Sequence, residues 1–285
     1  MNYKELILAL KELPYGYNVR VIGKTKYKRK IIAVEKILNR SSSTAIFLSS
    51  IHARENITTD LVFELIKRGC FNELEGINLS FILMANPDGV ELEQFGLECF
   101  NKKTQKKLIK MKGGSKDFSM WKANAVGVDI NNNFDARFGT NVGAKKPASQ
   151  GFVGRRKNSE KETKAIVKYT KKIKPFITIS YHTKGEEIYY NFFQEGKRLE
   201  RDRIIAEKFA QITGYVIKNV ENSSSGGYKD WCVEKLKIPA LTIEVGNDEL
   251  SHPITRENLE EIFEKNKNVA KAVEFAYNVF RETKV

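Results

Sequence analysis

Four polar residues of this 285-residue chain have types and positions that suit metal-assisted hydrolysis. His52 and Glu55 lie three apart, so both can bind one ion from a single turn, although H-x-x-E alone also occurs in ordinary polar turns. His182 is a second histidine, and two histidines with one carboxylate are a known ligand set for a catalytic zinc ion. Glu244 lies within the apolar run "LTIEVG", either neutralised in a salt bridge or poised as a general base.

These residues lie at or just past the ends of apolar segments that predict strands. His52 follows 44–50, His182 follows 175–181, and Glu244 lies in 239–245. Further strands are predicted at 17–23, 30–38 and 77–85, and helices at 2–13, 55–68, 158–172, 199–212 and 255–281. Apolar strands that alternate with helices favour an α/β fold with a mixed sheet covered on both faces. In such folds, ligands gather outside the strand ends.

The remaining sequence shows no linker, internal repeat or low-complexity tract, which predicts a single domain over 1–285. The segment "NPDGVEL" predicts a turn because Pro87 and Gly89 interrupt regular structure, and 90–150 is expected to be irregular. Within it, 102–116 holds seven lysines without interleaved aromatic residues. This pattern is typical of a solvated surface loop and not of a nucleic-acid platform.

The composition, 41% hydrophobic and 29% charged, is that of a soluble globular protein. The net charge of +14 would attract polyanions, but lysine is spread along the whole chain, so we expect no specific nucleic-acid partner. No apolar run reaches the ~20 residues of a membrane span. The start, "MNYKELILALKELPYGY", is typical of an amphipathic helix and not of a signal peptide. We therefore expect a cytoplasmic location, with export by a route without a signal peptide as the alternative.

The three cysteines, Cys70, Cys99 and Cys232, are widely spaced and form no C-x-x-C motif. They predict neither a disulfide framework nor a thiolate zinc site. The pattern leaves the oligomeric state open.

Five motifs resemble, in order and approximate spacing, those of the zinc carboxypeptidase family. They are "IHARENI", "NPDGVEL", "WKANAVGVDINNNFDARFG", "ISYHTKGEEIYY" and "GGYKDWCVEKLKIPALTIEVG". The lead-in "VIGKTKYKRKIIAVEK" also resembles a strand pair of that family, so the resemblance covers nearly the whole chain. It implies the family's mixed, mostly parallel eight-stranded α/β sheet with helices on both faces.

The resemblance also implies one zinc ion and a set of residue roles. His52, Glu55 and His182 resemble the zinc ligands, and Glu244 resembles the catalytic base. The implied reaction is amide hydrolysis by a metal-activated water. Where the family has an arginine after the "MW" pair, Lys122 can supply a positive charge to the developing oxyanion, but not a bidentate fork.

Two further positions concern substrate binding. Arg54 matches a family arginine that lines the substrate groove, and a salt bridge at the helix start is an equally plausible role. The family reads "NRN" where this chain has "NNN", and the family arginine clamps the substrate's C-terminal carboxylate. Asn132 therefore replaces a charged anchor with a neutral amide, and Asn131 and Asn132 are candidate substrate contacts.

The family's flexible-loop tyrosine is absent as well. Asn222 or Ser223 stands near its place, and Tyr228, just after the paired glycines, is the candidate substitute.

The same motifs look most like the bacterial branch that cleaves γ-D-glutamyl-diaminopimelate bonds in peptidoglycan stem peptides. The residue after that bond carries a second amine and carboxylate at its far end. Lys184 or Arg137 could meet this carboxylate, and Glu186 or Glu187 the amine, although each is as readily explained as a surface charge.

We therefore predict a zinc metallopeptidase that acts on such peptide or muropeptide substrates. One alternative is a metallocarboxypeptidase that releases C-terminal residues from ordinary peptides. Another is an inactive basic module that binds a polyanion. His252 is expected at a helix entry or on the surface, Asp230 should anchor the loop before Glu244, and Asp88 should orient a zinc-binding histidine.

Overall fold

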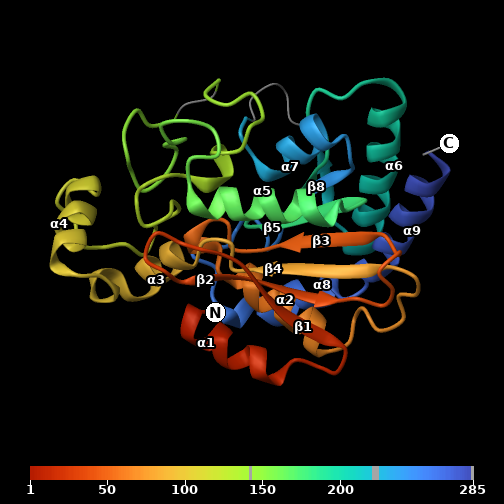
Figure 1. Cartoon of the computed structure of the whole chain (residues 1–285), viewed down its shortest axis with the longest axis horizontal. Coiled ribbons are helices and arrows are strands. Elements are labelled where there is room, and N and C mark those ends of the chain that lie inside the picture. The colour runs from red at the N-terminus through yellow and green to blue at the C-terminus, as the bar shows by residue number, and fades with distance from the viewer. Residues whose placement is uncertain (141–142, 220–224, 284–285) are drawn as a thin grey trace.

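The computed structural model describes residues 1–140, 143–219 and 225–283, which fold around one eight-stranded sheet (Figure 1). The strand order is β1-β2-β4-β3-β5-β8-β6-β7. The strands are β1 (Tyr17–Lys24), β2 (Lys30–Lys36), β3 (Thr44–Leu48), β4 (Asn78–Leu83), β5 (Ile177–His182), β6 (Glu187–Tyr189), β7 (Val216–Lys218) and β8 (Ala240–Glu244). The central strands β4, β3, β5 and β8 run parallel, while β1, β2 and β6 pair antiparallel with β2, β4 and β8. The predicted mixed eight-stranded sheet is confirmed.

Helices cover both faces of this sheet, as predicted (Figure 1). They are α1 (Tyr3–Ala9), α2 (Ile57–Lys67), α3 (Pro87–Phe95), α4 (Lys102–Met111), α5 (Lys161–Ile173), α6 (Gly196–Thr213), α7 (Tyr228–Trp231), α8 (Leu259–Asn266) and α9 (Val269–Glu282). Strand β3 shows the layering, because successive side chains of a strand point to opposite faces. Phe47 packs into the core under α2, α6, α8 and α9, whereas Ile46 and Leu48 pack into the core under α5 and α7.

Two helices replace part of the segment that the sequence predicts to be irregular. Asn86 accepts a hydrogen bond from the Gly89 amide at 3.1 Å, with Pro87 in the first turn, so "NPDGVEL" starts α3 and is not a turn. Asn101 caps α4 in the same way by accepting from the Thr104 amide at 3.0 Å. The lysine-rich segment is thus largely helical, and the loop prediction is wrong there. Helix α4 lies at the margin of the molecule, buries Leu108 and exposes its lysines (Figure 1).

The predicted helix over 255–281 is two helices. Asn266, at the end of α8, is fully buried and its amide donates to the Tyr215 hydroxyl at 2.9 Å. This buried polar contact coincides with the break between α8 and α9. The short strands β6 and β7 were missed because three residues are too few to show a period.

Two expectations about composition hold within the described chain. Its cysteines are all free. No helix in the described ranges is both long and apolar enough to cross a membrane.

Candidate metal centre and adjoining cavity

The polar residues singled out in the sequence meet at one edge of the sheet. Strands β3, β5 and β8 are parallel neighbours, so their carboxyl ends lie at the same edge. His182 ends β5 and Glu244 ends β8, and these two residues are partners in the strand register. His52 follows β3 and leads into a 3-10 turn, Ala53–Glu55, that carries Glu55.

His52, Glu55 and His182 form a buried cluster of three potential ligands. The Nδ1 atom of His52 lies 2.8 Å from Glu55 Oε1, and the Nδ1 atom of His182 lies 3.1 Å from Glu55 Oε2. The two Nδ1 atoms lie 3.1 Å apart. Two imidazole lone pairs and a carboxylate that converge in this way satisfy one another poorly, whereas a cation would satisfy all three. The nitrogen and oxygen donor set suits zinc.

A fourth buried residue, Asp129, contacts the opposite side of the His52 ring. Its Oδ1 atom lies 3.4 Å from His52 Nε2, which favours the proton on Nε2 and leaves Nδ1 free to bind metal. Burial opposes ionisation of Asp129, but His52 and the positive charge of Lys122 hold the pKa of its carboxyl well below the usual range. Asp129 lies inside the quoted motif "GVDINNNFD", but the sequence gave no reason to assign it this role, because nothing there shows which acid reaches a histidine.

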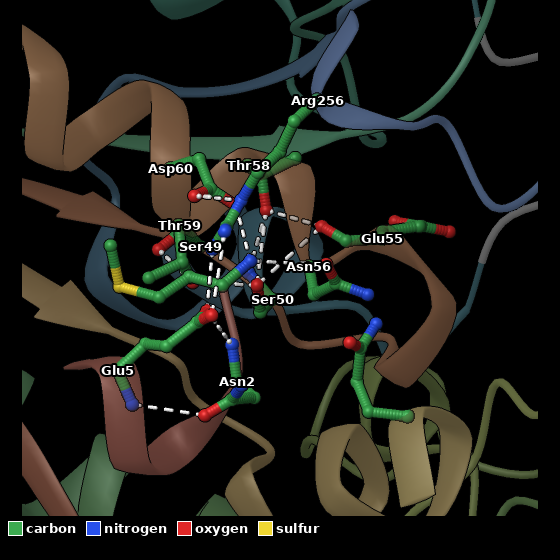
Figure 2. A network of polar contacts seen from close by, with 12 residues as sticks. Asn2, Glu5, Ser49, Ser50, Glu55, Asn56, Thr58, Thr59, Asp60 and Arg256 are labelled. Atoms are coloured by element: carbon green, nitrogen blue, oxygen red, sulfur yellow. Dashed lines mark hydrogen bonds and ion pairs between the residues drawn. The ribbon is translucent and has the colours of Figure 1, made fainter. Parts of the chain in front are cut away.

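A network of hydroxyl groups supports the metal corner from below (Figure 2). The Thr58 hydroxyl donates to the Glu55 carbonyl at 2.8 Å and accepts from the Ser50 amide at 2.9 Å. The Ser50 and Thr59 hydroxyls share a hydrogen bond of 2.6 Å. All these groups are buried, so the network ties the end of β3, the turn and the start of α2 into one rigid unit.

The two glutamates of the site have opposite electrostatic environments. Burial works against ionisation of Glu55, but the two histidines hold its pKa well below the ordinary value. Burial raises the pKa of Glu244 to about 7. The charges of Glu55 and Glu187 add to this rise, and Glu187 is the register partner of Glu244 on β6. Among the described residues, none hydrogen-bonds the buried Oε2 atom of Glu244. Glu55 is thus suited to bind a cation and Glu244 to exchange a proton near neutral pH.

The comparison with protein families now decides what this centre belongs to. Residues 5–269 match the zinc carboxypeptidase family. The chain belongs to the zinc carboxypeptidase family. The expected single zinc ion agrees with this family and with the His52–Glu55–His182 cluster.

Family members of known kind resemble the chain at modest identity. It is 29% identical over 238 residues to γ-D-glutamyl-L-diamino acid endopeptidase 1 of Lysinibacillus sphaericus, covering 78% of this chain and 59% of that protein. The chain thus spans less than two thirds of that relative's length. Carboxypeptidase A2 of Rattus norvegicus is 26% identical over 255 residues, covering 81% of this chain and 58% of that protein.

Solved zinc carboxypeptidase structures share the fold. Bovine thrombin-activatable fibrinolysis inhibitor superposes with a TM-score of 0.79 at 18% identity, covering 99% of this chain and 98% of the other. The murein-tripeptide amidase of Escherichia coli O157 gives a TM-score of 0.59 at 20% identity, covering 92% of each chain.

A cavity of about 210 Å³ opens beside Glu244. Thr242 and Glu244 line it from alternate positions of β8, and Tyr189 lines it from β6. Lys229 and Asp230, at the start of α7, also line it, together with Gly227 and Asn131. As in other carboxypeptidase folds, the site therefore lies at strand ends, with a loop-built cavity at its side.

Of the predicted substrate contacts, Asn131 lines this cavity and Tyr228 does not. Asn131 Oδ1 accepts from the Tyr228 amide at 3.0 Å, which fixes the asparagine. Tyr228 itself is 0% exposed, and its hydroxyl shares a hydrogen bond with Thr170. The prediction of Tyr228 as a substrate residue is wrong, because its ring packs in the core under α5. Asn222 and Ser223 lie outside the described residues.

Gly226 explains how the segment before α7 reaches the asparagines. Its φ is +75°, and a Cβ atom there would lie 2.4 Å from the Asn132 carbonyl oxygen. Asn132 is half-buried in the 3-10 turn Ile130–Asn132, and its amide donates to Asp129. Glycine is needed at 226 because two backbones touch where the family's clamp would stand.

Lys122 and Arg54 flank the metal corner. The Lys122 carbonyl accepts from the Ala53 amide at 3.0 Å, and its positive charge counteracts the rise of the pKa of Glu244. The Arg54 side chain reaches Gln150, with Nη1 at 3.4 Å from Oε1. Both positions agree with the predicted ones, and their roles towards substrate stay predictions.

The four candidates for the far end of a diamino acid are engaged elsewhere, and none lines the cavity beside Glu244. Lys184 pairs with exposed Asp248 at 2.9 Å, and the Arg137 guanidinium stacks 3.3 Å from the ring centre of Phe193. Glu186 pairs with Lys265, and Glu187 accepts from Tyr189 and lies 3.3 Å from Lys218.

Three supporting residues remain. Asp88 binds Arg29 at 2.9 Å and the Tyr27 amide at 3.1 Å, so its expected role behind a zinc-binding histidine is wrong, and Asp129 occupies that place. His252 is outside the cluster and shares a 3.4 Å contact with Thr183. Asp230 accepts from the Gly227 amide at 3.2 Å, which agrees with its expected anchoring role.

Proposed function

We propose that this chain is a zinc metallopeptidase that hydrolyses the γ-D-glutamyl-diaminopimelate amide of peptidoglycan stem peptides. The observation that carries the hydrolytic part is the position of Glu244. It ends β8 beside the His52–Glu55–His182 cluster, and it opens onto a cavity.

The residues of the site have separable tasks in this reaction. When bound by His52, Glu55 and His182, zinc supplies a Lewis acid that polarises the scissile carbonyl and makes water more acidic. The Glu244 carboxylate accepts a proton from the attacking water and then delivers it to the leaving amine. A pKa near 7 suits both transfers, because neither form is strongly favoured at neutral pH.

Two residues prepare the site for the change in charge. Lys122 places a positive charge near the atoms that become negative in the tetrahedral intermediate. Asp129 holds the His52 ring by its Nε2 side, so that the ring does not turn as the charge develops.

The substrate class rests on similarity and on one departure. The Lysinibacillus sphaericus relative carries the name of a γ-D-glutamyl-L-diamino acid endopeptidase. The Escherichia coli neighbour carries the name of a murein-tripeptide amidase. Asn132 supports the same class, because a neutral amide holds a terminal carboxylate less well than an arginine does.

The test compares two substrates with zinc-loaded protein. L-Ala-γ-D-Glu-diaminopimelate and simple blocked dipeptides are offered separately, and mass spectrometry identifies the products. We expect cleavage of the γ-D-glutamyl bond. Cleavage of the dipeptides alone would instead establish a carboxypeptidase of ordinary peptides.

A further inference from the structure

A buried ion pair forms the end of the cavity away from the metal centre. Lys229 and Asp230 both line the cavity, and the Lys229 ammonium lies 2.7 Å from Asp230 Oδ1. The side chains are only 5% and 1% exposed. Burial of a lysine is costly, so one that opens onto a cavity beside a candidate catalytic carboxylate calls for a functional explanation.

The ammonium is held firmly in this position. Besides Asp230 it donates to the Asn191 carbonyl at 2.7 Å, and it lies 5.5 Å from the centre of the Phe192 ring. An ammonium group has three donors, and within the described chain two acceptors contact it. A third N–H is therefore available to a ligand. Asp230 is fixed as well, because its Oδ2 accepts from the Gly227 amide.

The geometry of β8 sets the distance between this pair and the reaction centre. Thr242 and Glu244 lie two residues apart on the same face of the strand, which is about 7 Å. Tyr189 faces Thr242 in the register and forms the opposite wall. A side chain of about the length of lysine, extending from the residue after the scissile bond, would span this wall and bring its end to Lys229.

We propose that Lys229 and Asp230 are the receptor for a zwitterionic amino acid head at the end of that side chain. Lys229 binds the distal carboxylate, and Asp230 binds the distal ammonium. The inference rests on the proposed function and deepens it, because it selects a diamino dicarboxylic residue over lysine after the cleaved bond. A lone carboxylate or a lone ammonium would meet repulsion from one member of the pair, whereas the zwitterion matches both.

The test measures kcat/KM for two peptides that differ only in the distal carboxylate. These are L-Ala-γ-D-Glu-meso-diaminopimelate and L-Ala-γ-D-Glu-L-lysine. We expect Lys229→Met to lower kcat/KM at least about ten-fold on the first peptide, since a charge-assisted hydrogen bond is lost. On the second peptide the value should change less than about three-fold, because lysine has no carboxylate to lose. Equal losses on both peptides, or no loss, would refute the receptor.

Two variants guard against trivial explanations. Lys229→Met leaves Asp230 buried without its cation, so the double variant Lys229→Met, Asp230→Asn is measured in parallel to provide a neutral, foldable pair. Lys235→Met is the matched control, because Lys235 also pairs with the acidic residue before it, Glu234 at 3.4 Å, and does not line the cavity. Both peptides should be cleaved normally by this control.

Binding of free meso-diaminopimelate and of L-lysine, measured by calorimetry, separates this inference from the proposed function. If neither peptide is cleaved but diaminopimelate binds in a Lys229-dependent way, the receptor stands and the proposed function falls. If both peptides are cleaved and Lys229→Met leaves their ratio and the binding unchanged, the proposed function stands and the receptor falls.

Discussion

The carboxylates around the metal centre illustrate how surroundings assign roles to identical side chains. Glu55 is held between two histidines, which keep its pKa low, and is therefore a permanent anion that suits a cation ligand. Glu244 sits one strand further along the sheet edge, where burial and neighbouring negative charge raise its pKa to about 7. The difference between ligand and proton carrier therefore comes from position and not from residue type.

Glu244→Gln should keep zinc and lose hydrolysis. The amide has the shape of the carboxylate but cannot accept the proton, so kcat should fall by about 10²–10⁴-fold. Zinc content by elemental analysis and turnover of the γ-D-glutamyl peptide check this. Glu64→Gln, on α2 and paired with Arg68, is the control with normal activity. A near-normal rate in Glu244→Gln would remove Glu244 as the base.

Asp129→Asn should weaken zinc binding. Without the anion behind Nε2, the His52 ring loses its preferred tautomer and orientation, which typically costs 10- to 100-fold in metal affinity, roughly. Competition with a chromogenic chelator measures this. Asp88→Asn is the matched control, since Asp88 contacts Arg29 and the Tyr27 amide. Equal affinity losses in both variants would contradict the assigned role.

Among the elements, α5 covers the face of the sheet beside the site and starts with a buried acid. Glu162, in its first turn, is 1% exposed, and burial raises the pKa of its carboxyl to about 8. The folded protein therefore keeps a proton on Glu162 near neutral pH that the unfolded chain, with a pKa of about 4.5, releases.

This difference in proton binding predicts a pH dependence of stability. Since the folded state binds more protons, the contribution of Glu162 is full below about pH 4.5 and is lost as the pH rises to about 8. The slope approaches roughly 1.4 kcal/mol per pH unit. Glu162→Gln should remove that part of the slope in urea unfolding at pH 5, 6, 7 and 8, whereas Glu274→Gln, exposed on α9, should not. Parallel slopes in wild type and Glu162→Gln would contradict this prediction.

At the scale of the whole molecule, the metal centre joins segments that lie far apart in the sequence. His52 and His182 are separated by 130 residues, yet their Nδ1 atoms lie 3.1 Å apart. An ion that binds this arrangement and not the unfolded chain stabilises the entire fold.

Removal of zinc should therefore lower the melting temperature. At zinc concentrations about 1,000-fold above Kd the stabilisation is roughly 4 kcal/mol, which corresponds to a shift on the order of 10 °C. Calorimetry with a chelator and after zinc re-addition measures it. His182→Asn should lose the zinc-dependent shift, whereas His252→Asn should keep it, because His252 lies outside the cluster. A zinc shift that survives His182→Asn would show that the ion binds elsewhere.

Much of the fold was predictable because long apolar strands carry their own signal. Residues 44–50, 175–181 and 239–245 were expected to be strands, and they contain β3, β5 and β8. Helix α4 was missed because its lysines mask the two residues that it buries, Thr104 and Leu108. The break between α8 and α9 was missed because it coincides with a contact of Asn266 to a distant tyrosine.

The sequence by itself determined the chemistry that can occur: two histidines and a glutamate for a cation, and a further glutamate at the end of a buried strand. Residue type and strand patterning are local properties, and they suffice for this. Only the tertiary structure decided which other groups face the site. It put Asp129 and not Asp88 behind His52, buried Tyr228 in the core, and turned Lys229 towards the cavity beside Glu244. The physical reason is that distances across a sheet edge depend on strand order and loop packing, which no stretch of sequence contains.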